Sequence, residues 1–148
     1  MSHVTQLFID LVRVETRLYN AVNSRLRDEH GLALGQFEIM EIIDRVPGCR
    51  VLDIVREVAI TVGAASKAVD RLEAAGWCVR GAHPHDRRSS VLALTPRGAE
   101  LLARCRPVVE RELAALTAAV PAGELARTAA TLAALRATLE PRSSAAAE

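Results

Sequence analysis

Apolar residues recur at helical spacing over most of the chain. Near the N-terminus they stand alternately three and four positions apart, which predicts one long helix over about residues 4–29. The face defined in this way carries Val4, Leu7, Leu11, Val14, Leu18 and Ala21. A second apolar stripe runs beside the first, so the apolar face is wider than a single surface helix requires. Gly31 stands where a glycine commonly ends a helix.

Two further helices are predicted in the next part of the chain. The first runs over about 35–46 and ends at Pro47-Gly48, since this dipeptide favours a turn. The second is short, because the apolar positions between Val51 and Val58 follow the i, i+3, i+4, i+7 pattern for only two turns.

A tight turn then leads to a fourth helix. Thr61 is a good N-cap, and the helix that it begins reaches about Ala75. Two short helices that meet across a tight turn form a helix-turn-helix. The β-prone segments 77–82 and 91–95 follow, with a polar, basic stretch between them, which predicts a β-hairpin. In the fourth helix we expect inward positions at Val62, Ala65, Val69 and Leu72.

The C-terminal part of the chain predicts two more helices. Thr95-Pro96 combines an N-cap with a proline at the first helical position, so a helix begins there and runs over about 96–119. Apolar residues at spacings of three and four then indicate a last helix over about 125–139, which Pro141 ends.

These elements predict a mainly α fold with a small β-hairpin wing. We expect a winged helix-turn-helix with N- and C-terminal dimerisation helices, because the apolar faces of the terminal helices exceed what a core of this size covers. The whole chain is expected to form a single domain, residues 1–148. Its parts are dimerisation helices at about 4–30 and 99–140, the winged helix-turn-helix at about 35–98 and a tail at 141–148.

Composition excludes several classes of protein. Half of the 148 residues are apolar, a quarter are charged and the net charge is +1, so the chain is globular and carries no strong overall field. The charge is nevertheless uneven: residues 50–106 hold ten Arg or Lys against six acids, whereas both ends are mildly acidic. An anionic partner would therefore meet the middle of the chain.

The N-terminal stretch fits neither a signal peptide nor a membrane span, because Asp10 and Arg13 interrupt its apolar run. We therefore expect a cytoplasmic protein that has no contact with a membrane. Three widely spaced cysteines exclude a disulfide scaffold and fit a reducing compartment. Cys49 follows Pro-Gly beside Arg50, so it is the expected exposed thiol, with a neighbour that lowers its pKa.

The sequence predicts neither an enzyme nor a metal or cofactor site. No Ser/His/Asp or Cys/His set falls on adjoining elements, and no glycine-rich phosphate loop occurs. His83 and His85 flank Pro84 beside Asp86, but this group lacks a clear fourth ligand for a metal ion.

The continuous block from Thr61 to Gly98 resembles the MarR family of winged-helix transcription regulators. It reads SKAVDRLEAAGW over 66–77, DRR over 86–88 and LTPRGAELL over 94–102, and the resemblance extends over about residues 5–140. The resemblance implies a homodimer that binds double-stranded DNA, more often as a repressor than as an activator. Ala59 departs from the family pattern, since glycine often closes this turn. Gly63 and Ala64 also depart from it, because they replace polar residues.

The resemblance places base and phosphate contacts on the fourth helix and the hairpin. Ser66 and Lys67 can donate to base acceptors or phosphates, whereas Arg71 has a phosphate or structural role. On the hairpin, Arg88 would enter the minor groove, where a thin, weakly hydrated guanidinium suits the negative potential. Asp86 would orient it, and Arg87 would meet a phosphate. The predicted DNA-binding residues are Thr61, Gly63, Ser66, Lys67, Arg71, Asp86, Arg87 and Arg88.

A small phenolic or aromatic-acid effector is also implied by the resemblance. It would bind between the dimerisation helices and the DNA-binding part, with Arg13 or Arg17 as a partner for a carboxylate. Phe37 and Met40 can equally be plain core residues. The candidate ligand-binding residues are Arg13, Thr16, Tyr19, Gln36, Phe37 and Met40.

Two other functions stay open from the sequence. One is a winged-helix module for protein–protein interaction, which the near-neutral charge and the bare Gly63-Ala64 pair favour. The other is a thiol redox-sensing regulator that uses Cys49 or Cys78.

Overall fold

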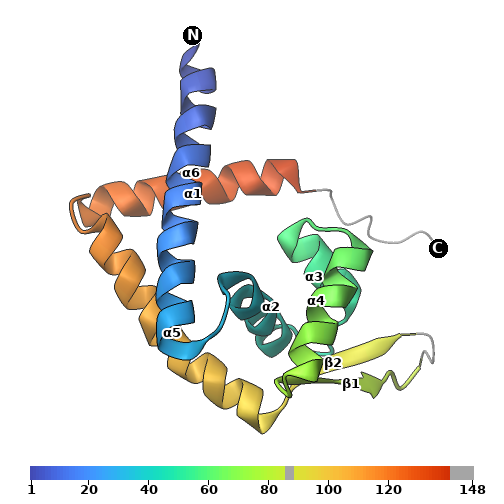
Figure 1. Cartoon of the computed structure of the whole chain (residues 1–148). Helices are drawn as coiled ribbons and strands as arrows, with labels where there is room; N and C mark the ends of the chain where they lie inside the picture. The colour runs from blue at the N-terminus through green and yellow to red at the C-terminus, as the bar shows by residue number, and fades with distance from the viewer. Residues whose placement is uncertain (86–88, 141–148) are drawn as a thin grey trace, which may run out of the picture. The chain divides into compact units, whose positions relative to one another are not determined.

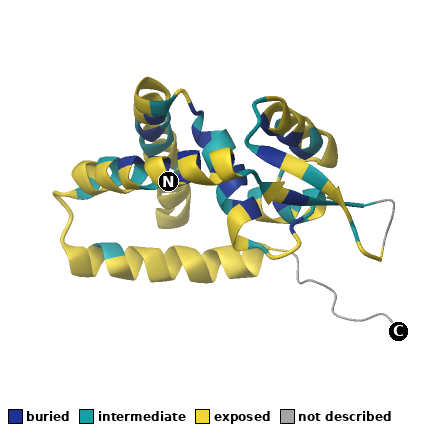
Figure 2. Cartoon of the chain, turned by 90° about the horizontal axis from the view of Figure 1, so that it is seen from below, coloured by how far each residue is buried: buried dark blue, intermediate teal, exposed yellow. Residues whose placement is uncertain are grey.

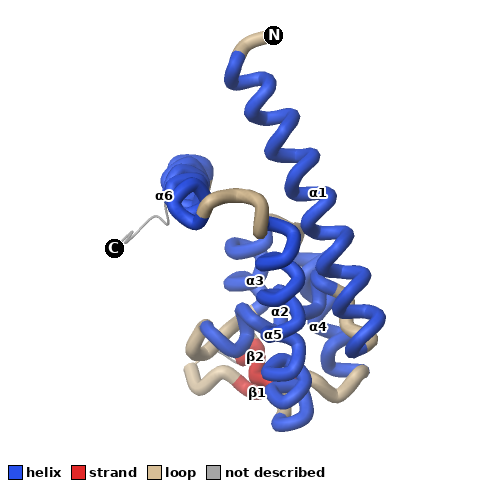
Figure 3. The backbone as a smooth tube through the Cα atoms, turned by 90° about the vertical axis from the view of Figure 1, so that its left-hand side faces the viewer, coloured by secondary structure: helices blue, strands red, loops and turns tan. Residues whose placement is uncertain are grey.

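The computed structural model describes residues 1–85 and 89–140, and in these ranges it contains six helices and one β-hairpin (Figure 1). Along the chain the hairpin lies between the fourth and fifth helices, and its two strands are drawn in red in Figure 3. The mainly α fold with a β-hairpin wing is confirmed. The elements are α1 (His3–His30), α2 (Leu34–Arg45), α3 (Val51–Val58), α4 (Val62–Ala74), β1 (Cys78–Ala82), β2 (Ser90–Leu94), α5 (Pro96–Thr117) and α6 (Ala122–Leu139).

The helix boundaries follow from local chemistry. The Ser2 hydroxyl accepts from the N–H of Thr5 at the start of α1. Gly31 ends α1 in the left-handed region at φ 66°, a conformation that costs glycine no steric penalty. The N–H of Arg50 donates to the Asp53 carboxylate at 2.8 Å, which fixes the entry to α3.

The chain divides into two compact units, residues 1–113 and 114–148, which we describe separately. In the first unit, α2 packs against α1, α3 and β2, and α4 packs against α3 and β1 (Figure 1). Its core contains no charged or polar side chain among the described residues. The side chains that are 0–2% exposed are Val22, Leu26, Leu32, Met40, Cys49, Ile54, Ala65, Val69, Leu72, Cys78, Leu102 and Cys105.

Ion pairs join α5 to the two helices that precede the helix-turn-helix. Arg106 of α5 contacts the carboxylates of Glu41 and Asp44 on α2, both at 2.6 Å. Arg25 of α1 pairs with Glu112 of α5 at 3.1 Å, and Arg111 pairs with Glu29 at the same distance. These contacts hold α5 against α1 and α2 in addition to the apolar core.

The start of α5 is fixed by a close contact with the end of α4. The Thr95 hydroxyl donates to the carbonyl of Gly76 at 2.7 Å and accepts from the N–H of Gly98 at 3.0 Å. Gly98 packs directly on Trp77, and a Cβ atom at this position would lie 2.0 Å from the Trp77 carbonyl oxygen. The TPRG segment therefore needs its threonine and its glycine for packing.

The second unit contains α6, which buries none of its residues (Figure 2). Most of its apolar residues are exposed, including Leu132, Leu135 and Leu139, and Leu125 is half-buried. In α1, too, several large apolar side chains are exposed: Val4, Leu7, Phe8, Val12 and Val14. Among the helices of the described ranges, none combines the length and the apolar character that a membrane span requires.

Candidate nucleic-acid interface and neighbouring cavity

The first turn of α4 is open to solvent. Thr61 has an extended backbone, and its hydroxyl accepts from the N–H of Ala64 at 3.1 Å, so it caps the helix as expected. The side chains of Thr61, Ala64 and Lys67 are exposed, as is Gly63, and Ser66 is half-buried. The structure thus brings four of the predicted DNA-binding residues to one exposed helix face.

One expectation for this helix is wrong. Val62 does not face inward but is 52% exposed, whereas Ala65, Val69 and Leu72 are fully buried as expected. Val62 is the first helical residue, and the core positions begin one turn further on. The spacing alone did not distinguish the two arrangements.

The turn before α4 has a left-handed backbone at Ala59, where the resembled family often has glycine. This residue has φ 56° and ψ 44° and is the one non-glycine residue with positive φ in the described ranges. An alanine in the left-handed region costs about 1 kcal/mol, which the surrounding core offsets.

Arg80 of β1 binds the carboxylates of α4. Its Nη2 lies 2.8 Å from Oδ1 of Asp70, and its Nη1 lies 3.3 Å from Oε1 of Glu73. Its backbone N–H also donates to Glu73, and its guanidinium donates to the carbonyl of Ser66. A single side chain thus orients the hairpin on the helix and offsets part of the negative charge of two acids that would repel a phosphate backbone. The sequence alone does not point to Arg80, because only the hairpin register brings it to α4.

The hairpin is antiparallel, with Cys78 opposite Leu94 and Ala82 opposite Ser90. Asp86, Arg87 and Arg88, the predicted minor-groove residues, lie outside the described residues. Beside the hairpin, a hollow of about 310 Å³ lies between the start of α3, α4 and β2. Its lining includes Arg50, Ser66, Arg80, Ser89 and Ser90. This hollow is rich in hydrogen-bond donors and lies next to the exposed face of α4.

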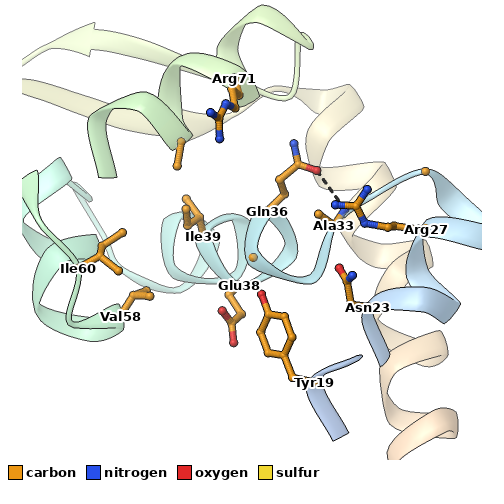
Figure 4. A pocket seen from close by; sticks show the side chains of 13 residues that line it. Tyr19, Asn23, Arg27, Ala33, Gln36, Glu38, Ile39, Val58, Ile60 and Arg71 are labelled. Atoms are coloured by element: carbon orange, nitrogen blue, oxygen red, sulfur yellow. Dashed lines mark hydrogen bonds between the residues drawn. The ribbon is translucent and has the colours of Figure 1, made fainter. Parts of the chain in front are cut away.

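Arg71 is on α4 but belongs to a different surface. It lines a cavity of about 660 Å³ together with residues of α1, α2 and α3 (Figure 4). Neither Arg71 nor Arg27, which lines the same cavity, lies within ion-pair distance of a carboxylate of the described residues. In Figure 4 both guanidinium groups lie near the side chain of Gln36.

Two amides of this cavity have a fixed orientation. The Asn23 oxygen accepts from the N–H of Leu34 at 2.9 Å, and the Gln36 oxygen accepts from the N–H of Ala33 at 3.0 Å. Each amide therefore keeps its NH₂ group available as a donor. Together with the two arginines, they make this side of the cavity a set of donors, and Ile39, Val58 and Ile60 supply its apolar wall.

The predicted ligand-binding residues are divided between three environments. Tyr19 and Gln36 line the cavity, and Phe37 lines an adjoining hollow of about 470 Å³ that Tyr19 also borders. Met40 is fully buried in the core. Arg13 and Thr16 are exposed on α1, and the structure does not bring them to either space. Asn23, Arg27 and Glu38 are lining residues that the sequence did not point to.

Glu38 is the carboxylate shared by both spaces. Burial, and secondly the charge of Glu15, raises its pKa above the ordinary value. The pKa of Tyr19 is raised as well, first by burial and then by Glu38 and Glu15. Both groups therefore favour their neutral forms more than they would in water.

The thiols do not match the expected redox sensor. Cys49, Cys78 and Cys105 are all buried, so the expectation that Cys49 is exposed is wrong. Burial, followed by the charge of Asp53, raises the pKa of Cys49 to about 11. The neighbouring Arg50 does not lower this pKa, because the Cys49 side chain is fully buried in the core under the hairpin. The backbone carbonyl of Cys49 accepts from the N–H of Leu92 in β2 at 2.7 Å. Within the described ranges, no group of three or more His, Cys, Asp or Glu side chains is arranged to hold a metal ion.

A helix-turn-helix followed by a two-stranded hairpin, with the second helix of the pair exposed at its start, defines a winged helix-turn-helix protein. The comparisons with known proteins agree with this class. A family model described as "MarR family" matches residues 32–90. The multiple antibiotic resistance protein MarR of Escherichia coli is 27% identical over 120 residues, which are 76% of this chain and 83% of that protein.

Solved structures show the same fold. Sco3205 of Streptomyces coelicolor, a MarR family transcriptional regulator in complex with DNA, covers the whole chain with a TM-score of 0.84 at 22% identity, and 95% of that protein is matched. The transcriptional repressor CouR, bound to a 23-mer DNA duplex, covers 92% of this chain and 96% of its own with a TM-score of 0.82 at 28% identity. The chain thus has the fold of MarR-family transcriptional regulators, and its residues 32–90 match the model of that family.

Proposed function

We propose that the chain is a homodimeric, sequence-specific repressor that binds double-stranded DNA in the cytoplasm and is released by a small aromatic effector. The observation that carries the proposal is the exposed first turn of α4, with Ser66 and Lys67 one turn further on the same open face. The complexes of Sco3205 and CouR with DNA support it.

The electrostatics of the interface are compatible with a polyanion. Arg80 pairs with both acids of α4, Asp70 and Glu73, and so reduces their repulsion of the phosphates that Lys67 attracts. Arg87 and Arg88 of the hairpin add positive charge, and we assign Arg88 to the minor groove and Asp86 to its orientation. In this arrangement the near-zero net charge of the whole chain does not oppose DNA binding, because the positive charge is local.

Dimer formation is proposed from the apolar faces that the chain leaves exposed. Leu7 and Phe8 of α1 are 60% and 65% exposed, and Leu139 of α6 is 74% exposed. Apolar faces of this kind mark surfaces for association. A second copy of the chain would also place two recognition helices about one helical turn of DNA apart, which fits a near-palindromic site of roughly 16–20 base pairs.

We place the effector in the cavity between α1, α2 and α4. Its donors suit a carboxylate or a phenolate, and its apolar wall suits an aromatic ring. Because Tyr19 lies on α1 and Arg71 on α4, a ligand that contacts both would favour one arrangement of these helices over others.

Genomic DNA capture tests the proposal. Sheared DNA from the source genome is incubated with the purified chain, and the retained fragments are sequenced. We expect a small set of fragments with a shared near-palindrome, and Lys67→Ala should retain less of this set. A protein that retains no sequence above background contradicts the assignment as a DNA-binding regulator.

A further inference from the structure

The first turn of α4 presents apolar groups where a base-reading helix commonly presents polar ones. Val62 is 52% exposed, Ala64 is exposed, and a Cβ atom added at Gly63 would meet nothing within 4 Å. The side chains of this turn include no amide, guanidinium or carboxylate. If the exposed face of α4 reads DNA as proposed above, its leading edge does so largely with methyl groups.

The exposure of Val62 does not follow from packing. Ala65, Val69 and Leu72 already fill the inward positions of α4, and all three are fully buried. Val62 lies at the edge of the buried face, one turn before the half-buried Ser66, while Gly63 stands one turn before the exposed Lys67. An apolar side chain and a bare backbone position thus precede the two polar ones on adjacent rows of the helix surface.

The four base pairs differ in what they offer to such a face. Adenine is read by paired amide contacts, and guanine by a guanidinium or an ammonium group, whereas thymine presents a C5-methyl group that apolar side chains contact. Thr61 uses its hydroxyl oxygen as the helix cap, so it is already engaged as an acceptor. Gly63 allows the helix backbone to approach the base edges closely, because it has no side chain.

We infer that Val62 is a specificity-determining residue that selects thymine in each half-site of the operator by contact with its C5-methyl group. Lys67, one turn further on, reads the neighbouring guanine or binds its phosphate. This inference rests on the proposed DNA-binding function and adds the base chemistry that the site recognises.

The test begins with selection from a pool of random duplexes, which yields an operator sequence whether or not the natural target has been identified. We expect thymine at one fixed position in both half-sites. The selected duplex is then synthesised with deoxyuridine at this position, which removes only the methyl group. The dissociation constant should increase about fourfold for each methyl group lost, the factor expected for one buried methyl-sized group.

Variants of the chain assign this effect to Val62. In Val62→Ala, affinity for the thymine duplex should fall, and the preference for thymine over deoxyuridine should fall with it. Val62→Thr is the second variant. It keeps the branched shape of the side chain at this exposed helix position and replaces one of its methyl groups with a hydroxyl. Val79→Ala is the matched control, because Val79 is 48% exposed and its position in β1 alternates with Arg80, which faces α4. It should leave the preference unchanged.

The outcomes separate this inference from the proposed function. Equal affinity of the unmodified protein for the thymine and deoxyuridine duplexes overturns it, while leaving DNA binding intact. An undiminished thymine preference in both Val62 variants also overturns it. Failure of the selection to enrich any duplex contradicts the proposed function itself.

Discussion

At the residue scale, the positions that define this fold do so through single atomic contacts. Gly98 is the clearest example, because the Trp77 carbonyl occupies the place of a side chain. Ala59 shows the opposite case: it adopts a left-handed conformation that glycine would adopt without cost. The motif that the sequence analysis used for the family resemblance therefore includes a glycine whose role is to let α5 pack on the end of α4.

Gly98→Ala should strongly destabilise the protein. The new Cβ would lie 2.0 Å from a backbone oxygen, so the backbone itself must move. Overpacking of this kind costs about 1–3 kcal/mol or more of the free energy of unfolding, measured by urea denaturation. Gly123→Ala is the control, since nothing lies within 4 Å of its Cβ position. Equal stability of the two variants would contradict the packing described here.

The buried thiols predict a pH dependence of stability. The folded-state pKa of Cys49 is about 11, above its ordinary value of 9.0, because burial disfavours the thiolate. This contribution to stability is fully present below pH 9 and is lost as the pH rises towards 11. The free energy of unfolding should therefore decrease between these values, and less steeply in Cys49→Ala. An identical slope in the variant would show that the Cys49 thiol titrates normally.

At the element scale, Arg80 connects the hairpin to the recognition helix. Its contacts to Asp70 and Glu73 position β1 and at the same time offset part of the negative charge of these two carboxylates. A helix that binds DNA depends on both effects. The hairpin must be correctly oriented relative to the helix, and the charge of the helix surface determines how strongly it attracts the phosphates.

Arg80→Gln should weaken DNA binding by about tenfold or more, since Asp70 and Glu73 then lose their ion-pair partner and repel the phosphates more strongly. Fluorescence anisotropy with a captured duplex measures this. Adding Asp70→Asn and Glu73→Gln to the same variant should restore much of the affinity if charge is the cause. Arg104→Gln, which breaks an exposed pair within α5, serves as the control. Unchanged affinity in Arg80→Gln would remove this residue from the account.

Much at the element scale could be predicted from the sequence. Helical spacing, the Thr61 cap and the Pro96 start predicted all six helices and both strands to within a few residues. What the sequence could not show depends on contacts between distant segments. The burial of Cys49 under β2, the Arg80 contacts and the position of Arg71 in the cavity all require the hairpin and α1 to be placed first. The inward position expected for Val62 was wrong, because periodicity is ambiguous at the first residue of a helix.

At the scale of the whole molecule, α1 and α6 expose apolar faces to water, and within the described residues a single chain provides no partner that covers them. Exposed apolar faces of this kind favour association with a second copy of the chain.

Leu7→Glu introduces a charge into the α1 face, where Leu7 is 60% exposed. Light scattering should give the mass of two chains for the unmodified protein and a shift towards one chain for this variant. Asn20→Glu adds the same charge on the opposite side of α1 and should leave the dimer intact. A monomeric unmodified protein at micromolar concentration would contradict the dimer.

The central claim is that two copies of this chain bind a DNA duplex through α4 and the hairpin. The most direct measurement is the affinity for a captured duplex as a function of salt concentration. The account predicts tight binding at low salt, a linear decrease of log K with log salt, and a slope smaller by about one unit in Lys67→Ala and in Arg88→Ala. No binding at low salt, or a slope unchanged from the unmodified protein in both variants, would contradict it.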